Sequence, residues 1–119
     1  MKIIISGAGE VGSHLAKMLR NEANDICVID SNQQRLTALS ETADVVTVCG
    51  NPASIEVLKN AGAEKADLFV AVNPSTSQNV NVVCSALAKS LGSKKVVCRV
   101  NNEEYLAYDN KYLFSDMGI

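Results

Sequence analysis

Short apolar runs alternate along this chain with segments in which apolar residues recur every three or four positions. Residues 2–6 (KIIIS) form a continuous run rich in β-branched residues, and comparable runs follow at residues 25–30, 45–49, 67–72 and 95–100. Continuous apolar runs of this length are typical of strands covered on both faces, as in a parallel sheet. The pattern therefore predicts five buried strands.

The segments between the runs predict helices. The first, over residues 10–22, has an apolar face formed by Val11, Leu15, Met18 and Leu19. The others are expected after Ser31 or Asn32, from Ser54 to about Gly62, from about Val80 to Gly92, and over residues 102–113. Because a crossover between parallel strands is usually helical, this alternation predicts one α/β domain over residues 1–119. Its expected architecture is a doubly wound parallel sheet with strand order 3-2-1-4-5.

Composition narrows the range of functions. The 119 residues are 47% hydrophobic and 20% charged, which excludes disorder, and the net charge of −2 gives no electrostatic reason to bind nucleic acid. No apolar run approaches the roughly 20 residues that span a bilayer, and the amino terminus lacks the plan of a signal peptide. We therefore expect a soluble, cytoplasmic protein that neither inserts into a membrane nor binds nucleic acid.

The four cysteines, Cys27, Cys49, Cys84 and Cys98, lie in apolar stretches without a Cys-x-x-Cys spacing. With His14 as the one histidine, the usual ligand set of a zinc site is missing. We expect reduced and mostly buried thiols. A disulfide or a redox function is the alternative.

A Gly-x-Gly-x-x-Gly motif follows the first predicted strand and opens the first predicted helix. Its residues are Gly7, Ala8, Gly9, Glu10, Val11 and Gly12. Such a motif permits a tight turn, close approach of a phosphate to the backbone, and packing of the helix on the sheet. The helix N-terminus is then placed to hold a pyrophosphate.

Asp30 ends the second strand 18 residues after Gly12, where a carboxylate accepts hydrogen bonds from both ribose hydroxyls. The acid would repel a 2′-phosphate, and residues 31–34 contain no Arg or Lys, so the sequence disfavours NADP. The alternative is a turn with a capping aspartate. Arg35 is interpreted as a solvated charge on the second helix.

Ligands of doubly wound sheets bind beyond the carboxyl ends of the strands. The loops expected there include Ser31, Gly50, Asn51, Asn73 and Arg99. Asn51 is a candidate for the adenine edge and Asn73 for the ribose or phosphate, with local turn formation as the alternative for both. Arg99 is a candidate phosphate contact or a structural, salt-bridged arginine.

The sequence shows no means of catalysis. It has no His/Asp pair placed for acid–base chemistry and no Tyr-x-x-x-Lys pairing. We therefore expect a domain that binds a nucleotide and is not an enzyme.

Several short segments match one known family. They are residues 1–5 with the glycine motif, Val28-Ile29-Asp30, Gly50-Asn51-Pro52, Ala61-Gly62-Ala63, Ala66-Asp67, Ala71-Val72 and Arg99-Val100. In these segments, and over essentially its whole length, the chain resembles the amino-terminal KTN or RCK regulatory domains of the TrkA potassium-uptake proteins. The resemblance implies that residues 7–11 hold phosphate, that Asp30 holds ribose, and that Asn73 and Pro74 line the site.

The resemblance also implies partners and a mechanism. It suggests a peripheral subunit on the inner face of the plasma membrane that binds NAD(H), ATP or ADP. This subunit would form a dimer or higher homo-oligomer and gate a membrane potassium-translocating subunit of the TrkH or KtrB type through a population shift.

Two other functions remain open from the residues, namely the cofactor-binding half of an NAD-dependent oxidoreductase and a redox-responsive interaction domain. A Rossmann sheet has six strands, and the resemblance places the sixth after Gly118-Ile119, where this chain stops. We therefore expect a truncated fragment of a longer protein.

Overall fold

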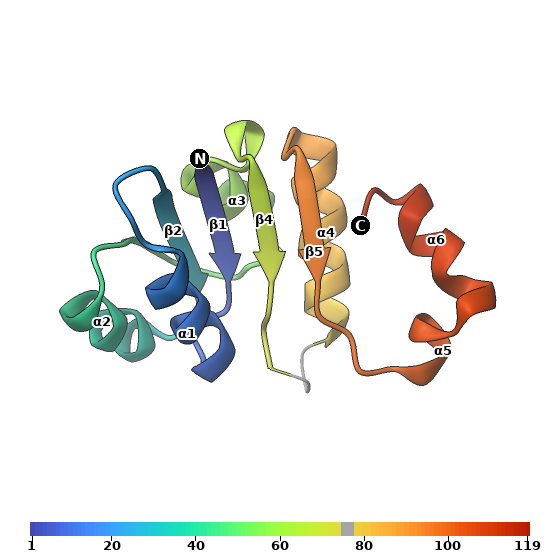
Figure 1. Cartoon of the computed structure of the whole chain (residues 1–119), viewed down its shortest axis with the longest axis horizontal. Coiled ribbons are helices and arrows are strands. Elements are labelled where there is room, and N and C mark those ends of the chain that lie inside the picture. Colours follow the sequence, from blue (N-terminus) through green and yellow to red (C-terminus); the bar gives the residue numbers. More distant parts are fainter. Residues whose placement is uncertain (75–77) are drawn as a thin grey trace.

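A parallel sheet forms the centre of the computed structural model, which describes residues 1–74 and 78–119 (Figure 1). Within these residues the sheet has five strands in the order β3-β2-β1-β4-β5, as predicted. Ile3 of the central strand pairs with Ile26 on one side and with Leu68 on the other. The strands are β1 (Lys2–Ser6), β2 (Asp25–Asp30), β3 (Val46–Cys49), β4 (Leu68–Ala71) and β5 (Lys95–Cys98).

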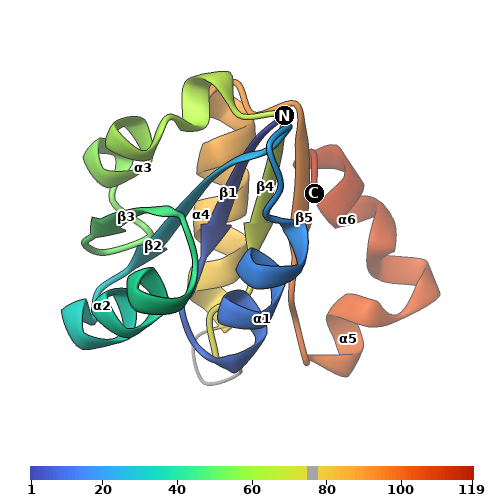
Figure 2. The ribbon, with the colours of Figure 1, turned by 60° about the vertical axis from the view of Figure 1, so that its left-hand side comes forward.

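Helices cover both faces of the sheet (Figures 1 and 2). The helices α1 (Glu10–Leu19) and α2 (Gln33–Thr42) lie on one face, and α3 (Ile55–Ala61) and α4 (Gln78–Leu91) lie on the other. Because successive strand residues point to opposite faces, Ile3 and Ile5 pack in the core under α1 and α2, whereas Ile4 packs in the core under α3 and α4. In the described part of the chain, no helix has both the length and the hydrophobicity needed to cross a membrane.

The first helix is rotated on the sheet relative to the predicted face, of which Leu15 and Leu19 pack against the core as expected. Its buried residues are Gly12 and Ala16, whereas Val11 and Met18 are 42% and 65% exposed. The helix ends at Leu19 instead of residue 22. The backbone of the glycine loop runs so close to Gly12 that the smallest residues must face inward, which turns Val11 and Met18 outward.

The C-terminal segment also differs from the single helix predicted over residues 102–113. It forms α5 (Glu103–Leu106), the 3-10 turn η3 (Tyr108–Asn110) and α6 (Lys111–Asp116). The helix breaks because Ala107 is extended, and Asn110 Nδ2 then donates to the carbonyl oxygen of Glu104 (3.0 Å). The segment lies beyond β5 at one edge of the sheet (Figure 1).

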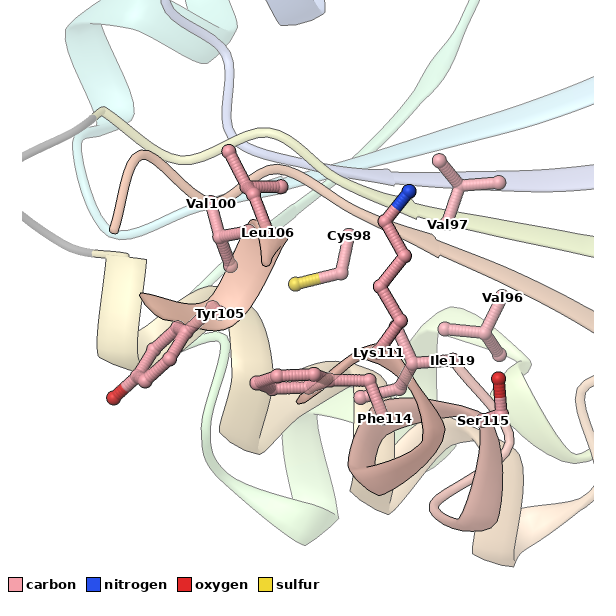
Figure 3. A pocket seen from close by; sticks show the side chains of 10 residues that line it. All are labelled: Val96, Val97, Cys98, Val100, Tyr105, Leu106, Lys111, Phe114, Ser115 and Ile119. Carbon is pink, nitrogen blue, oxygen red and sulfur yellow. The ribbon is translucent and has the colours of Figure 1, made fainter. Parts of the chain in front are cut away.

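An apolar cavity of about 310 Å³ separates this segment from β5 (Figure 3). The rings of Tyr105 and Phe114 lie 5.1 Å apart at its wall, and Cys98 of β5 lines it. Lys111 also lines the cavity. The cavity lies at the edge of the sheet, away from the carboxylate of Asp30.

The cysteines are less uniformly buried than predicted. Cys27 and Cys84 are buried and Cys98 is half-buried, but Cys49 is exposed. The difference arises because β3 is an edge strand, so its apolar run is covered only in part. All four thiols are free.

We expect alkylation of the native protein to distinguish these thiols. Burial raises the pKa of Cys27 to about 11 and that of Cys84 to about 12. At pH 8 fewer than about one in a thousand of these two thiols would be ionised. Iodoacetamide at pH 8, followed by mass spectrometry, should therefore modify Cys49 first and Cys27 and Cys84 only after unfolding in urea. Rapid labelling of Cys27 or Cys84 in the native Cys49→Ser variant would contradict this expectation.

Candidate functional site

The glycine loop between β1 and α1 is built on a backbone conformation that only glycine adopts readily. Gly7 has φ +114°, and its N–H donates to the carbonyl oxygen of Ile29 (2.8 Å). A Cβ at this position would lie 2.9 Å from both the Val72 oxygen and the Asn73 nitrogen. Gly7 therefore fits between the ends of β2 and β4, the two strands that flank β1.

The other two glycines of the loop face different surroundings. A Cβ on Gly12 would overlap the carbonyl oxygen of Gly7 and lie 2.8 Å from its carbonyl carbon. A Cβ on Gly9 would meet no described atom within 4 Å. Gly9 also precedes α1 without supplying a side-chain cap. Gly12 is thus required for helix packing, whereas Gly9 leaves the backbone at the helix N-terminus open to a ligand.

Asp30 anchors the glycine loop to the end of β2. Its Oδ2 accepts a hydrogen bond from the backbone N–H of Ala8 (2.8 Å), and its Oδ1 accepts one from Asn32 (2.8 Å). The residue is buried, at 5% exposure, but it lines a cavity. Because each carboxylate oxygen accepts more than one hydrogen bond, both retain capacity for ligand hydroxyls.

This cavity, of about 550 Å³, opens at the carboxyl ends of β2, β3 and β4. It brings together five of the residues predicted from sequence: Asp30, Ser31, Asn51, Asn73 and Pro74. Asn51 also forms a local turn, because its Oδ1 accepts from the N–H of Ala53 (2.9 Å). The local turn expected as the alternative for Asn51 is therefore present, and contact with adenine stays a prediction.

Three further residues of the cavity, Arg35, Pro52 and Val80, were not predicted as part of the site. Arg35 was interpreted as a solvated charge, but its Nη1 lies 3.8 Å from Asp30 Oδ2 and its side chain is 47% exposed. The position of Arg35, three residues after the helix cap Asn32, could have predicted this contact. Asn32 caps α2, and a residue in the first helical turn after the cap lies close to the end of the preceding strand.

Three other groups of predicted residues do not line this cavity. The glycine loop lies beside the cavity, because the N–H of Ala8 donates a hydrogen bond to Asp30, which lines it. Gly50 donates its N–H to the carbonyl oxygen of Asp30 (3.0 Å), which holds it next to the site. The backbone N–H of Arg99 donates to the oxygen of Ala71 (2.9 Å), and phosphate contact by its side chain stays a prediction.

Asn73 belongs both to the cavity wall and to the protein core. It is 6% exposed, and its Nδ2 donates to Ser6 Oγ (3.0 Å) and to Asn81 Oδ1 (2.9 Å). Its backbone N–H donates to the same Asn81 oxygen (2.9 Å). Asn73 is therefore held rigidly where it faces the cavity.

Proteins of similar sequence come from potassium-uptake systems. The chain is 43% identical over 106 residues to a Trk system potassium uptake protein TrkA homolog of Archaeoglobus fulgidus, covering 89% of this chain and 23% of that protein. It is 42% identical over 120 residues to the Trk system potassium uptake protein TrkA of Haemophilus influenzae, covering 100% of this chain and 26% of that protein. The chain thus spans about a quarter of the length of these relatives.

Solved structures share the fold. The TrkA-N domain of the Escherichia coli inner membrane protein ybaL superposes with a TM-score of 0.77 at 22% identity, over 98% of this chain and 82% of that one. The GsuK channel bound to NAD gives a TM-score of 0.77 at 20% identity, over 98% of this chain and 20% of that one. The model of the TrkA-N domain family matches residues 3–119. This chain therefore belongs to the TrkA-N domain family.

Proposed function

We propose that this chain is a regulatory nucleotide-binding domain that senses NAD(H), ATP or ADP and controls potassium uptake through a membrane transporter. The observation that carries the proposal is the buried carboxylate of Asp30, which is bonded to the glycine loop and lines a 550 Å³ cavity. A carboxylate at the end of β2 suits the ribose diol that these nucleotides share. The GsuK channel, which has the same fold, was solved with NAD bound.

Binding without catalysis is the second part of the proposal. Among the described residues that line the cavity, Asp30 and Arg35 carry charge, and these two side chains pair with each other. A catalytic acid or base needs a titratable group free to reach the reacting atoms. The names of the relatives, which are potassium-uptake proteins, support regulation over the alternative of an oxidoreductase.

The names of the same relatives support a proposal about the partners. We propose that the protein acts in the cytoplasm as a homo-oligomer, bound at the inner face of the membrane to a potassium-translocating subunit of the TrkH or KtrB type. A nucleotide that binds one arrangement of the assembled domains more tightly than another would shift the population of the transporter states.

The proposal also covers selectivity against NADP. The charge of Asp30 opposes a 2′-phosphate at the position of the ribose diol. Arg35 also lines the cavity, but its guanidinium pairs with the carboxylate of Asp30. We therefore propose a preference for NAD over NADP that depends on Asp30.

Parallel titrations test this function. We expect calorimetry of the purified chain to detect binding of at least one of NAD, NADH, ATP and ADP. NADP should bind at least tenfold more weakly than NAD, because its phosphate meets a carboxylate. Adenine-free ribose 5-phosphate serves as the control for non-specific binding of a sugar phosphate. Absence of binding by all four nucleotides would overturn the proposal.

A further inference from the structure

Asn81, in the first turn of α4, is a fully buried polar residue, and every polar group of its side chain forms hydrogen bonds. Its Oδ1 accepts hydrogen bonds from the backbone N–H and from the Nδ2 of Asn73, both at 2.9 Å. Its Nδ2 donates to the carbonyl oxygens of Asn73 (3.1 Å) and Arg99 (3.0 Å). A side-chain amide has two acceptor sites and two donor hydrogens, so Asn81 uses its whole capacity.

The partners of Asn81 belong to different strands of the sheet. Asn73 follows β4, and Arg99 follows β5 and begins the segment that leads to α5. Asn73 also donates to Ser6 at the end of β1, so the network joins the carboxyl ends of three strands to α4. One of these partners, Asn73, lines the cavity. A single side chain of α4 therefore links a wall of the cavity to the start of the C-terminal segment.

Because this hydrogen-bond network is buried, its side chains have little freedom to move. Hydrogen bonds are stronger in a low-dielectric interior, and a buried polar group that loses its partner is costly. A ligand that contacts Asn73 therefore acts on the hydrogen-bond partner of Asn81. The side-chain amide of Asn81 also donates to the carbonyl oxygen of Arg99. A ligand that restricts the movement of Asn73 would therefore also restrict the movement of Arg99.

We infer that Asn81 is a positioning residue that holds Asn73 in its ligand-binding geometry and couples occupancy of the cavity to the segment after β5. Asn81 itself does not line the cavity, so it acts through Asn73. The inference rests on the proposed nucleotide-binding function and adds a route by which binding reaches the C-terminal segment. The glycine motif and Asp30 give a different set of contacts: their hydrogen bonds lead to β2, to the start of α2 and to the loop after β3, and Gly7 packs against the backbone of Asn73.

An Asn81→Asp variant tests the inference with little change of shape. Aspartate keeps an acceptor for Asn73 but replaces the two donor hydrogens with an oxygen that repels the carbonyl oxygens of Asn73 and Arg99. Asn79→Asp is the matched control, because it makes the same change at an exposed position of the same helical turn. Calorimetry should show at least tenfold weaker binding of NAD to the first variant and a change within twofold for the second.

Hydrogen exchange separates coupling from a purely structural role of Asn81. Replacing a purely structural residue would leave the ligand-dependent slowing of amide exchange unchanged. On addition of NAD, amide exchange in residues 99–106 should slow at least threefold in the wild-type chain and in Asn79→Asp. The slowing should disappear in Asn81→Asp at NAD concentrations that saturate it. Circular dichroism and urea unfolding establish that each variant is folded. If Asn81→Asp does not fold, Asn81→Ser replaces it, because serine keeps one donor and one acceptor in less volume.

The outcomes separate this inference from the function on which it rests. If the wild-type chain binds NAD but exchange in residues 99–106 is unchanged, the coupling is refuted while the proposed function stands. A folded variant at residue 81 that retains wild-type affinity and the exchange response also refutes it. If the wild-type chain binds another of the four nucleotides but not NAD, the same measurements are made with that nucleotide and have the same outcomes. If it binds none of the four, the proposed function and this inference both fail.

Discussion

Alanine in place of Gly12 is expected to destabilise the domain by about 3 kcal/mol or more. The added Cβ would overlap the carbonyl oxygen of Gly7, and this neighbour is backbone that cannot rotate away. To make room, α1 would have to move off β1, which would open the contacts of Ala16 in the core. The higher helix propensity of alanine, about 1 kcal/mol, offsets only part of this cost. The shift of the urea unfolding midpoint at constant slope measures the effect.

Gly9→Ala is the matched control, because it makes the same change three residues earlier in the same loop. Its Cβ meets no described atom within 4 Å, so the free energy of unfolding should change by less than about 0.5 kcal/mol. The methyl group would instead occupy space near the helix N-terminus, where we propose that phosphate binds. We expect normal stability with weaker binding of NAD. Equal loss of stability in the two variants would show that the loop packs differently.

Replacing Asp30 by asparagine is expected to weaken NAD binding at least tenfold, equivalent to about 1.4 kcal/mol. Hydrogen bonds from ligand hydroxyls to a charged carboxylate contribute more than those to a neutral amide. Asparagine retains one acceptor oxygen for the N–H of Ala8 or Asn32, whereas alanine would leave both without a side-chain acceptor. Calorimetric titration with NAD and NADP measures both affinities.

The same variant tests the preference between the two cofactors. Loss of the charge at Asp30 frees Arg35 to meet a 2′-phosphate, so the ratio of the NAD and NADP affinities should fall at least threefold. Asp25→Asn is the control, because Asp25 is an exposed aspartate at the opposite end of the same strand. If Asp30→Asn binds NAD as the wild-type chain does, Asp30 is a structural cap and the ribose assignment is wrong.

The parallel sheet could be predicted because its signal is local. Each apolar run is long enough for one strand, and the intervening segments are long enough for a crossover. The final helix could not be predicted in the same way. Its composition is compatible with one helix, but Ala107 adopts an extended conformation and Asn110 bonds back to Glu104. Such breaks depend on a few tertiary and side-chain contacts that apolar spacing does not record.

The site was predicted in part for a similar reason. Asp30, Asn51 and Asn73 each end or follow a strand, so their position at the carboxyl edge follows from the parallel direction of the strands. Arg35 and Asn81 lie on helices, where a polar residue is ordinarily assigned to solvent. Their contacts with Asp30 and Asn73 depend on how each helix is rotated against the sheet.

The sequence by itself determined the alternation of strands and helices, the glycine turn and the position of Asp30, because these depend on spacing along the chain. The tertiary structure alone decided which face of α1 is buried, that Arg35 pairs with Asp30, and that Asn81 joins Asn73 to Arg99. The physical reason is close packing. Where a helix settles on a sheet is decided by backbone approach and buried hydrogen bonds between residues distant in sequence, which the periodicity of one segment cannot specify.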